Sequence, residues 1–361
     1  MPTLQLHDST AHPDGWHHVR LPGGYEWWYF DAEDPTTDTQ VVALFMEGFI
    51  FHPGYLRAHR RFERSPTRHR PPIAGDYPCV YLCVYRSGRL LHQFFTQYRP
   101  EQFRAASDRA DVQIGPNSLM TTETGYALEL TGTPWKLTGR GPITMSDRTL
   151  SASLEFRSRV RHAPIERTFL SSEMTGADHR WAIAAPACDV AGTISVTGAM
   201  SESITFTGRG YHDHNFGTAP IGRGLKRWTW GRALFSDRVL TFHYAEPRDS
   251  RLSPEVHLVE VDASGTPRDI ASPRVTGDFT ARCKPAMMLV YPPLLAFGDE
   301  LTLSNPRVID PSPFYLRLMF DAESRGEGST AFCEIAYPHR LRWPILGRMI
   351  EMSFDKRSLN R

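Results

Sequence analysis

The chain has 361 residues, of which 40% are hydrophobic and 22% are charged, a composition typical of a folded globular protein. Its 41 basic and 40 acidic side chains nearly cancel, which argues against nucleic acid as a partner, because phosphate binding usually requires a basic excess. This length suits two domains of roughly 150–200 residues, and we predict them over residues 1–200 and 201–361.

The first residues, MPTLQLHDSTAHPDG, lack the basic and apolar regions of a secretory signal, so we expect a cytoplasmic protein. No apolar run reaches the roughly 18 residues that a membrane-spanning helix needs. The longest, Ala286–Phe297, is interrupted by two prolines and predicts a buried strand, with peripheral contact with the inner membrane as the alternative. Five scattered cysteines fit reduced thiols rather than a disulfide framework.

Short runs rich in Val, Tyr, Phe and Thr recur between glycines and prolines, and they predict antiparallel strands joined by turns. These runs lie at residues 41–45, 80–84, 126–130, 194–196, 239–242 and 256–261. Helices are predicted only at residues 101–108 and in the tail at 341–352, where Pro344 restricts a helix to the residues that follow it. The predicted fold class is mostly β, with sandwiches or barrels and few short helices.

Residues 24–31, GYEWWYFD, predict a strand that is aromatic on both faces. Alternate side chains of an extended strand point to opposite faces. One face then carries Glu26, Trp28 and Phe30. The other carries Tyr25, Trp27, Tyr29 and Asp31. Such a strand is either buried on both faces of a barrel, with its indole N–H groups bonded, or forms one wall of an apolar ligand cavity.

Residues 55–72, YLRAHRRFERSPTRHRPP, carry six arginines against a single acid. A solvated loop or lid is one interpretation of this segment. The other is a patch that meets an anionic membrane surface or an acidic substrate.

The densest group of polar and aromatic side chains lies at residues 208–232. In an extended strand, Tyr211, Asp213 and Asn215 share one face and the two histidines at 212 and 214 share the other. The histidine pair could ligate a metal if His243 or Glu246 supplied a third ligand. The alternative is proton chemistry at Asp213, flanked by groups that can shift or relay its proton.

The next predicted strand places Trp228, Trp230 and Arg232 on one face. Two indoles and a guanidinium can simply stack as a structural element. Indole faces can also hold a developing carbocation in a dry pocket. The strand that follows adds His243, Tyr244 and Glu246 as further polar candidates.

These central motifs resemble a known enzyme family. GYHDHNFGT and RWTWGR are similar to the pattern Y-x-D-x-N-x-G … W-x-W-G-R of the carotenoid 1,2-hydratases (CrtC), whose wider superfamily includes AttH-like proteins and lipocalin-like pericyclases. Further similarities lie at residues 26–31, 110–119, 312–317 and 343–350, so the resemblance covers most of the chain. It implies two lipocalin-like antiparallel β-barrel or sandwich domains, with a ligand cavity at or near their interface.

The resemblance also implies a reaction, the addition of water across a terminal trisubstituted double bond of a carotenoid or other isoprenoid. An acid protonates the alkene, the tertiary cation is sheltered, and one water is admitted. No metal and no organic cofactor are implied, and the partner is an apolar small molecule. The implied catalytic residues are Asp213 as proton donor, with His214, Tyr211 and Glu246. The implied substrate-binding residues are Trp228, Trp230, Phe216, Asn215, Trp28, Tyr29, Glu26, Tyr244 and His243.

Two other functions remain open from the sequence. The first is a cofactor-free cyclase or pericyclase of a polyketide or terpenoid, which would act through a shaped aromatic pocket. The second is a carrier of hydrophobic ligands that catalyses no reaction. The sequence leaves the oligomeric state open.

Overall fold

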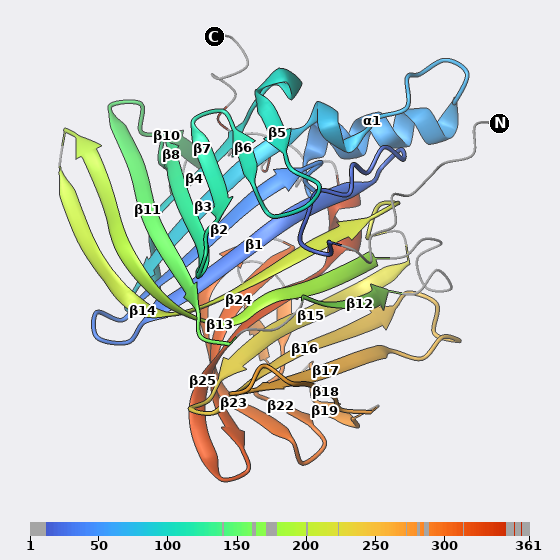
Figure 1. Cartoon of the computed structure of the whole chain (residues 1–361). Helices are drawn as coiled ribbons and strands as arrows, with labels where there is room; N and C mark the ends of the chain where they lie inside the picture. The colour runs from blue at the N-terminus through green and yellow to red at the C-terminus, as the bar shows by residue number, and fades with distance from the viewer. Residues whose placement is uncertain are drawn as a thin grey trace.

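The computed structural model describes residues 12–138, 141–160, 164–170, 179–199, 201–222, 224–271, 273–279, 282–284, 289–312, 314–343, 350 and 355. Two curled antiparallel sheets dominate it, one built from the blue-to-green part of the chain and one from the yellow-to-red part (Figure 1). The mostly β, lipocalin-like fold class expected from the sequence is therefore confirmed.

The first sheet has the order β4-β3-β2-β1-β14-β13-β11-β8-β7-β6-β5, and β12 pairs with β13 beside this path. Its strands are β1 (Tyr25–Asp34), β2 (Thr39–Glu47), β3 (Pro78–Arg86), β4 (Arg89–Gln97), β5 (Phe103–Ala105), β6 (Val112–Ile114), β7 (Asn117–Thr121), β8 (Gly125–Gly132), β11 (Arg148–Ser158), β12 (Ile165–Leu170), β13 (His179–Gly198) and β14 (Glu202–Gly217).

The second sheet has the order β18-β17-β16-β15-β25-β24-β23-β22-β19. Its strands are β15 (Leu225–Leu234), β16 (Arg238–Pro247), β17 (Glu255–Asp262), β18 (Pro267–Asp269), β19 (Val275–Gly277), β22 (Leu294–Phe297), β23 (Leu301–Ser312), β24 (Tyr315–Ser324) and β25 (Glu327–Ala336). Two small hairpins complete the described strands, β9 (Trp135–Thr138) with β10 (Gly141–Thr144) and β20 (Arg282–Lys284) with β21 (Leu289–Tyr291).

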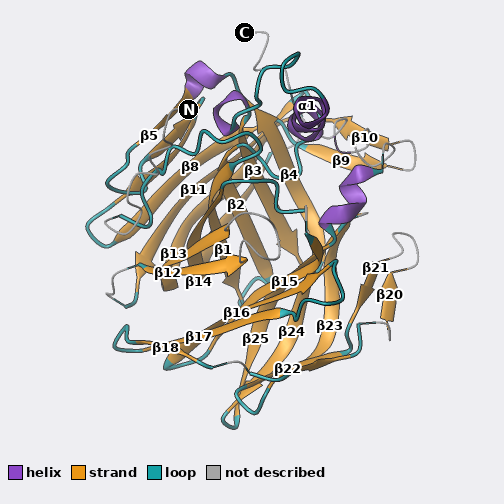
Figure 2. Cartoon of the chain, turned by 90° about the vertical axis from the view of Figure 1, so that its right-hand side faces the viewer, coloured by secondary structure: helices purple, strands orange, loops and turns teal. Residues whose placement is uncertain are grey.

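The basic segment predicted as a loop is instead largely a helix, α1 (Pro53–Arg64), seen end-on beside the first sheet in Figure 2. Its start follows ordinary rules, because Pro53 occupies the first turn and the His52 side chain accepts a hydrogen bond from the Tyr55 N–H. Tyr55 and His59, four residues apart, are the buried side of the helix. Four of the six arginines therefore lie on a helix rather than on a lid, and the other two follow its end.

The helix predicted at residues 101–108 is wrong. A single 3₁₀ turn, η2 (Pro100–Gln102), leads directly into β5. Two further 3₁₀ turns are η1 (Ala74–Asp76) and η3 (Pro338–Arg342). Most of the tail segment 341–352, where a helix was also predicted, lies outside the described residues.

The described residues form three buried apolar clusters. One lies inside the first sheet, one lies inside the second, and the third joins side chains from both sheets and is called the seam below. Every residue of β1 is buried, with Trp27 and Tyr29 in the seam and Trp28 and Phe30 inside the first sheet. The strand is therefore buried on both faces, the first of the two alternatives that its sequence left open.

The strands of the first sheet end with β14 at Gly217, and those of the second begin with β15 at Leu225. The division of the chain into two domains at residue 200 stays a prediction. Among the described residues, no helix is long and apolar enough to cross a membrane. Among the described residues, four buried cysteines form no disulfide bond: Cys79, Cys83, Cys188 and Cys333.

Candidate active site

Aromatic side chains from the two sheets contact one another in the seam. Trp27 of β1 stacks on Trp228 of β15, with ring centroids 6.3 Å apart. Tyr29 meets Trp230 edge-on at 4.9 Å between ring centroids. Both contacts join a strand of the first sheet to a strand of the second, so the seam contains a buried aromatic layer.

A single carboxyl group of β14, Asp213, points into this layer and is 2% exposed. It accepts hydrogen bonds from the Trp181 indole N–H at 2.9 Å, the Tyr211 hydroxyl at 2.9 Å and the Asn215 amide at 2.7 Å. Burial raises the pKa of Asp213 to about 7, although these donors favour the ionised form and lower it in part. A carboxyl in this environment can hold a proton near neutral pH.

The donors around Asp213 come from neighbouring strands in fixed register. Tyr211 and Asn215 lie two residues before and after Asp213 on the same face of β14, and Trp181 stands opposite Asn215 on β13. Burial holds the pKa of Tyr211 well above its ordinary value, so its hydroxyl stays protonated and donates. The carboxyl is therefore fixed from three sides by groups that are themselves buried.

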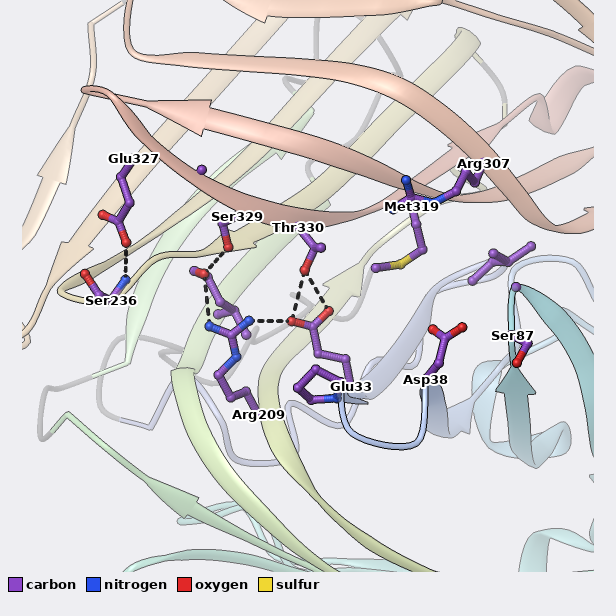
Figure 3. A pocket seen from close by; sticks show the side chains of 15 residues that line it. Glu33, Asp38, Ser87, Arg209, Ser236, Arg307, Met319, Glu327, Ser329 and Thr330 are labelled. Carbon is purple, nitrogen blue, oxygen red and sulfur yellow. Dashed lines mark hydrogen bonds and ion pairs between the residues drawn. The ribbon is translucent and has the colours of Figure 1, made fainter.

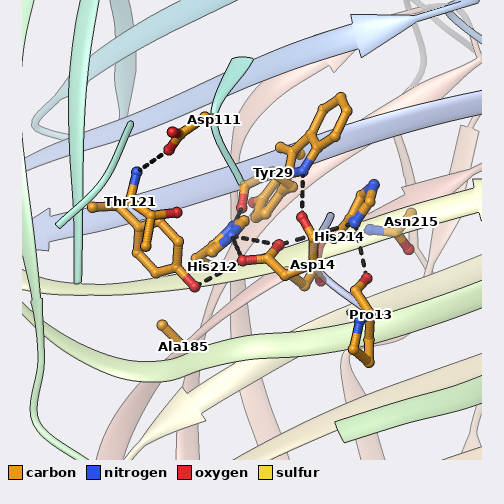
Figure 4. Close-up of polar contacts among 12 residues, drawn as sticks. Pro13, Asp14, Tyr29, Asp111, Thr121, Ala185, His212, His214 and Asn215 are labelled. Carbon is orange, nitrogen blue, oxygen red and sulfur yellow. Dashed lines mark hydrogen bonds and ion pairs between the residues drawn. The ribbon is translucent and has the colours of Figure 1, made fainter. Parts of the chain in front are cut away.

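The alternate side chains of β14 point away from the seam, into the first sheet. His212 stacks on Phe30 at 3.9 Å between ring centroids, and its Nε2 lies 3.1 Å from Asp14 Oδ1 (Figure 4). The Tyr126 hydroxyl donates to the other Asp14 oxygen at 2.8 Å. Burial alone would raise the pKa of Asp14, but the His212 contact and the Tyr126 hydrogen bond lower it. This is a structural network behind the strand that carries Asp213.

His214 belongs to the same inner face. Its Nδ1 lies 3.0 Å from the Pro13 carbonyl oxygen (Figure 4). Its Nε2 lies 3.0 Å from Glu26 Oε1. Its ring stacks on Trp28 at 4.4 Å between centroids. The third member is His17, whose Nδ1 is also 3.0 Å from Glu26 Oε1, and all three side chains bring ligand atoms within 4.8 Å of one another.

The ligand set that the sequence suggested for a metal is therefore wrong. His212 and His214 do share a face, but neither His243 nor Glu246 approaches them, because both lie in the second sheet. His243 points into the seam, where its ring meets Trp181 edge-on at 4.3 Å between centroids. Burial holds the pKa of His243 well below its ordinary value, so this ring is neutral.

Two other predicted site residues lie off the seam. Glu246 forms an ion pair with Arg227 and lies 3.4 Å from Lys226 Nζ at the end of β16. Tyr244 packs against the core of the second sheet, and its hydroxyl donates to Glu246 at 3.3 Å. The reason is strand parity, because His243 faces the seam and Tyr244 and Glu246 therefore face the other side of β16.

The predicted residues thus fall into three groups. The structure brings seven of them together in the seam: Tyr29, Tyr211, Asp213, Asn215, Trp228, Trp230 and His243. Four lie inside the first sheet: Glu26, Trp28, His214 and Phe216. Two lie on the opposite side of β16: Tyr244 and Glu246.

Sequence reasoning missed two features of the seam. Trp181 lies in a run of small residues, HRWAIAAP, that carries no motif, and only its pairing with β14 brings it to Asp213. Glu334 of β25 accepts hydrogen bonds from the Tyr29 hydroxyl at 3.3 Å and from Arg317 Nε at 3.1 Å. A lone acid in the apolar run AFCEIAY was the available signal for Glu334.

Arg232 crosses the seam as a brace between the sheets. Its Nε donates to Asp31 Oδ1 of β1 at 2.8 Å, and its other nitrogens approach Asp31 and Glu33. Arg232 and Asp31 are almost completely buried, and the paired carboxylates raise the pKa of Arg232 even though burial opposes its charge. Arg232 therefore has a structural role, one of those that the sequence left open for this strand.

A cavity of about 600 Å³, lined by both charged and apolar side chains, opens between the two sheets (Figure 3). Arg209 and Glu33 form an ion pair of 2.9 Å in its wall, and the Thr330 hydroxyl donates to the same carboxylate. Ile309 and Met319 line this cavity and also belong to the seam cluster. The cavity therefore adjoins the aromatic layer that holds Asp213, but Asp213 does not line it.

Comparison with known proteins gives a consistent result. The family described as carotenoid hydratase CrtC matches residues 47–361, which confirms the resemblance seen in the sequence. Hydroxyneurosporene dehydrogenase of Chlorobaculum tepidum is 29% identical over 309 residues, which cover 84% of this chain and 78% of the relative. Acyclic carotenoid 1,2-hydratase of Rhodobacter capsulatus is 25% identical over 264 residues, covering 69% of this chain and 80% of the relative.

Solved structures share the fold at low sequence identity. A putative AttH protein from Nitrosomonas europaea has a TM-score of 0.57 and 16% identity, covering 93% of this chain and 98% of that one. Kievitone hydratase from Nectria haematococca has a TM-score of 0.50 and 10% identity, covering 90% of this chain and 95% of that one.

Proposed function

Because the chain belongs to the carotenoid hydratase CrtC family, we propose that it adds water across a terminal trisubstituted double bond of a carotenoid or related isoprenoid. The observation that carries this proposal is the buried Asp213 carboxyl, held by three donors in an aromatic seam. An apolar polyene suits such a layer, because burying it there removes its surface from water.

In the proposed reaction, the Asp213 carboxyl gives its proton to the less substituted alkene carbon, and a tertiary cation forms on the other carbon. A water molecule attacks this cation through its oxygen and then loses a proton, which returns to Asp213. Atoms and charge balance with water as the only co-reactant, and the reaction is redox-neutral overall. The reaction therefore needs no organic cofactor.

The neighbours of Asp213 have separate roles in this proposal. Tyr211, Trp181 and Asn215 stabilise the carboxylate after it has given up its proton, because all three donate to its oxygens. Trp228 and Trp230 shield the cation with their ring faces and exclude further water.

The direct test is incubation of the purified chain with an acyclic carotenoid such as lycopene or neurosporene, followed by mass spectrometry. A product heavier than the substrate by one water supports hydration. A product of unchanged mass but different chromatographic mobility would instead indicate a cyclase, and recovery of unaltered bound polyene would indicate a carrier.

The cation-shielding role predicts that Trp228→Leu lowers kcat more than it raises KM. The indole face interacts with a positive charge that exists only after protonation, whereas the leucine keeps an apolar contact with the neutral substrate. Steady-state kinetics with the same polyene measure both constants. Equal effects on kcat and KM would show that Trp228 only packs against the substrate.

A further inference from the structure

We propose that His17, Glu26 and His214 form a binding site for a divalent transition-metal ion, best matched by Zn²⁺, inside the first sheet. The site goes beyond the proposed hydration, because it lies on the face of β14 opposite to Asp213. The family resemblance does not imply a metal. The proposal is carried by the geometry of the three side chains.

The three ligand atoms are already close to the spacing of a metal site. His17 Nδ1 and His214 Nε2 each lie 3.0 Å from Glu26 Oε1. Zinc bonds to histidine nitrogen and carboxylate oxygen are about 2.0–2.2 Å long, which puts tetrahedral ligands roughly 3.3 Å apart. A small outward movement of the side chains would therefore admit the ion. Two histidines and one carboxylate are also an established ligand set for zinc and for non-haem iron.

The orientation of the His214 ring also fits a metal ligand. Its Nδ1 lies 3.0 Å from the Pro13 carbonyl oxygen, which can only accept, so Nδ1 carries the hydrogen. Its Nε2 therefore faces Glu26 Oε1, at 3.0 Å. The same carboxylate oxygen accepts a hydrogen bond from the His17 backbone N–H at 2.8 Å, which fixes Glu26 between the two imidazole rings.

Two further features match a metal site. Histidines that bind metals usually donate their other ring N–H to a carbonyl or carboxylate, as His214 does to Pro13. Among the described residues, Glu26 Oε2 and His17 Nε2 are buried and have no hydrogen-bond partner.

Packing fixes the two rings in place. His214 stacks on Trp28 with an interplanar angle of 13°, and His17 stacks on Phe216 at 3.7 Å between ring centroids. His17 precedes β1, whereas His214 lies in β14, so the ion would tie the segment before the first strand to the centre of the sheet. The expected consequence is higher thermal stability of the metal-bound chain.

The test uses the full chain after removal of metals with a chelator. Titration with Zn²⁺, followed by calorimetry, is expected to show binding of about one ion per chain, as for a single zinc site. Co²⁺ bound in the same place should give visible absorption that added Zn²⁺ abolishes. Glu26→Gln keeps the shape of the side chain but removes its charge, and should weaken Zn²⁺ binding by ~100-fold or more.

The matched control is Glu33→Gln, which alters another buried carboxylate of β1 that contacts Arg209 and Thr330 and no histidine. This variant should bind Zn²⁺ like the unaltered chain. The proposal would be overturned if both variants bound Zn²⁺ equally well. It would also be overturned if the unaltered chain with Co²⁺ showed no visible absorption that added Zn²⁺ abolishes. If Glu26→Gln does not fold, the Co²⁺ measurement on the unaltered chain still decides. None of these readouts involves a polyene, so they stand apart from the test of hydration.

Discussion

Replacing Asp213 by asparagine is expected to abolish hydration of the polyene, with a loss of at least ~10²–10⁴-fold in kcat, the usual contribution of a positioned general acid. Asparagine has nearly the same shape and still accepts hydrogen bonds, but it cannot donate a proton to an alkene. Product formation by mass spectrometry gives the rate. The melting temperature should change by only a few degrees, because the amide removes a buried acid without leaving a cavity.

Glu246→Gln provides the contrast for this experiment, because the two acids were both candidates in the sequence. Glu246 pairs with Arg227 on the side of β16 that faces away from the seam. Its amide variant should therefore keep most of the activity. A loss as large as that of Asp213→Asn would show that the second acid acts in the reaction, and an active Asp213→Asn enzyme would refute the proposed proton donor.

Arg232→Met should be the most destabilising of these substitutions, lowering the free energy of unfolding by about 3–5 kcal/mol. The reason is that methionine leaves the buried carboxylate of Asp31 without its partner. Urea denaturation measures this loss. Restoring stability by a second substitution, Asp31→Leu, would show that the uncompensated charge rather than lost packing caused the effect.

The control for this prediction is Arg157→Met. Arg157 also pairs with a carboxylate, that of Glu155 at 3.0 Å, but its side chain is 66% exposed. Exposed pairs contribute little to the free energy of unfolding, because water and salt screen them. A similar loss of stability in both arginine variants would mean that burial of the Arg232 pair has no special importance.

Local patterns in the sequence were sufficient for the fold class and for the faces of single strands. The alternation of β1 and β14 correctly predicted which side chains point together, because the period of a strand is fixed by its backbone. The helix α1 was not predicted, because the segment was interpreted from its positive charge alone. Its signals were present, in the proline at position 53 and in the spacing of Tyr55 and His59.

The assembly of the site depends on contacts between distant segments, and a single sequence does not reveal these. Asp213 and Tyr29 are partners across β14 and β1, and Trp181 reaches Asp213 only through the pairing of β13 with β14. The prediction of Glu246 as a catalytic residue beside Asp213 was a different kind of error. Its parity relative to His243 already excluded it from the face that His243 shares with Trp230.

The pairing of β1 with β14 has a consequence for insertions and deletions. It runs without irregularity from Tyr25 opposite Gly217 to Glu33 opposite Arg209. A slip of β14 by one residue would turn Asp213 into the interior of the first sheet and bring His212 and His214 into the seam. A slip by two residues would return the face that carries Asp213 to the seam, but each side chain would be displaced to the next position along the same face. Insertions or deletions of two residues in β14 should therefore be tolerated better than those of one residue. Only a shift by an odd number of residues replaces the face with Asp213 by the face with the two histidines in the seam.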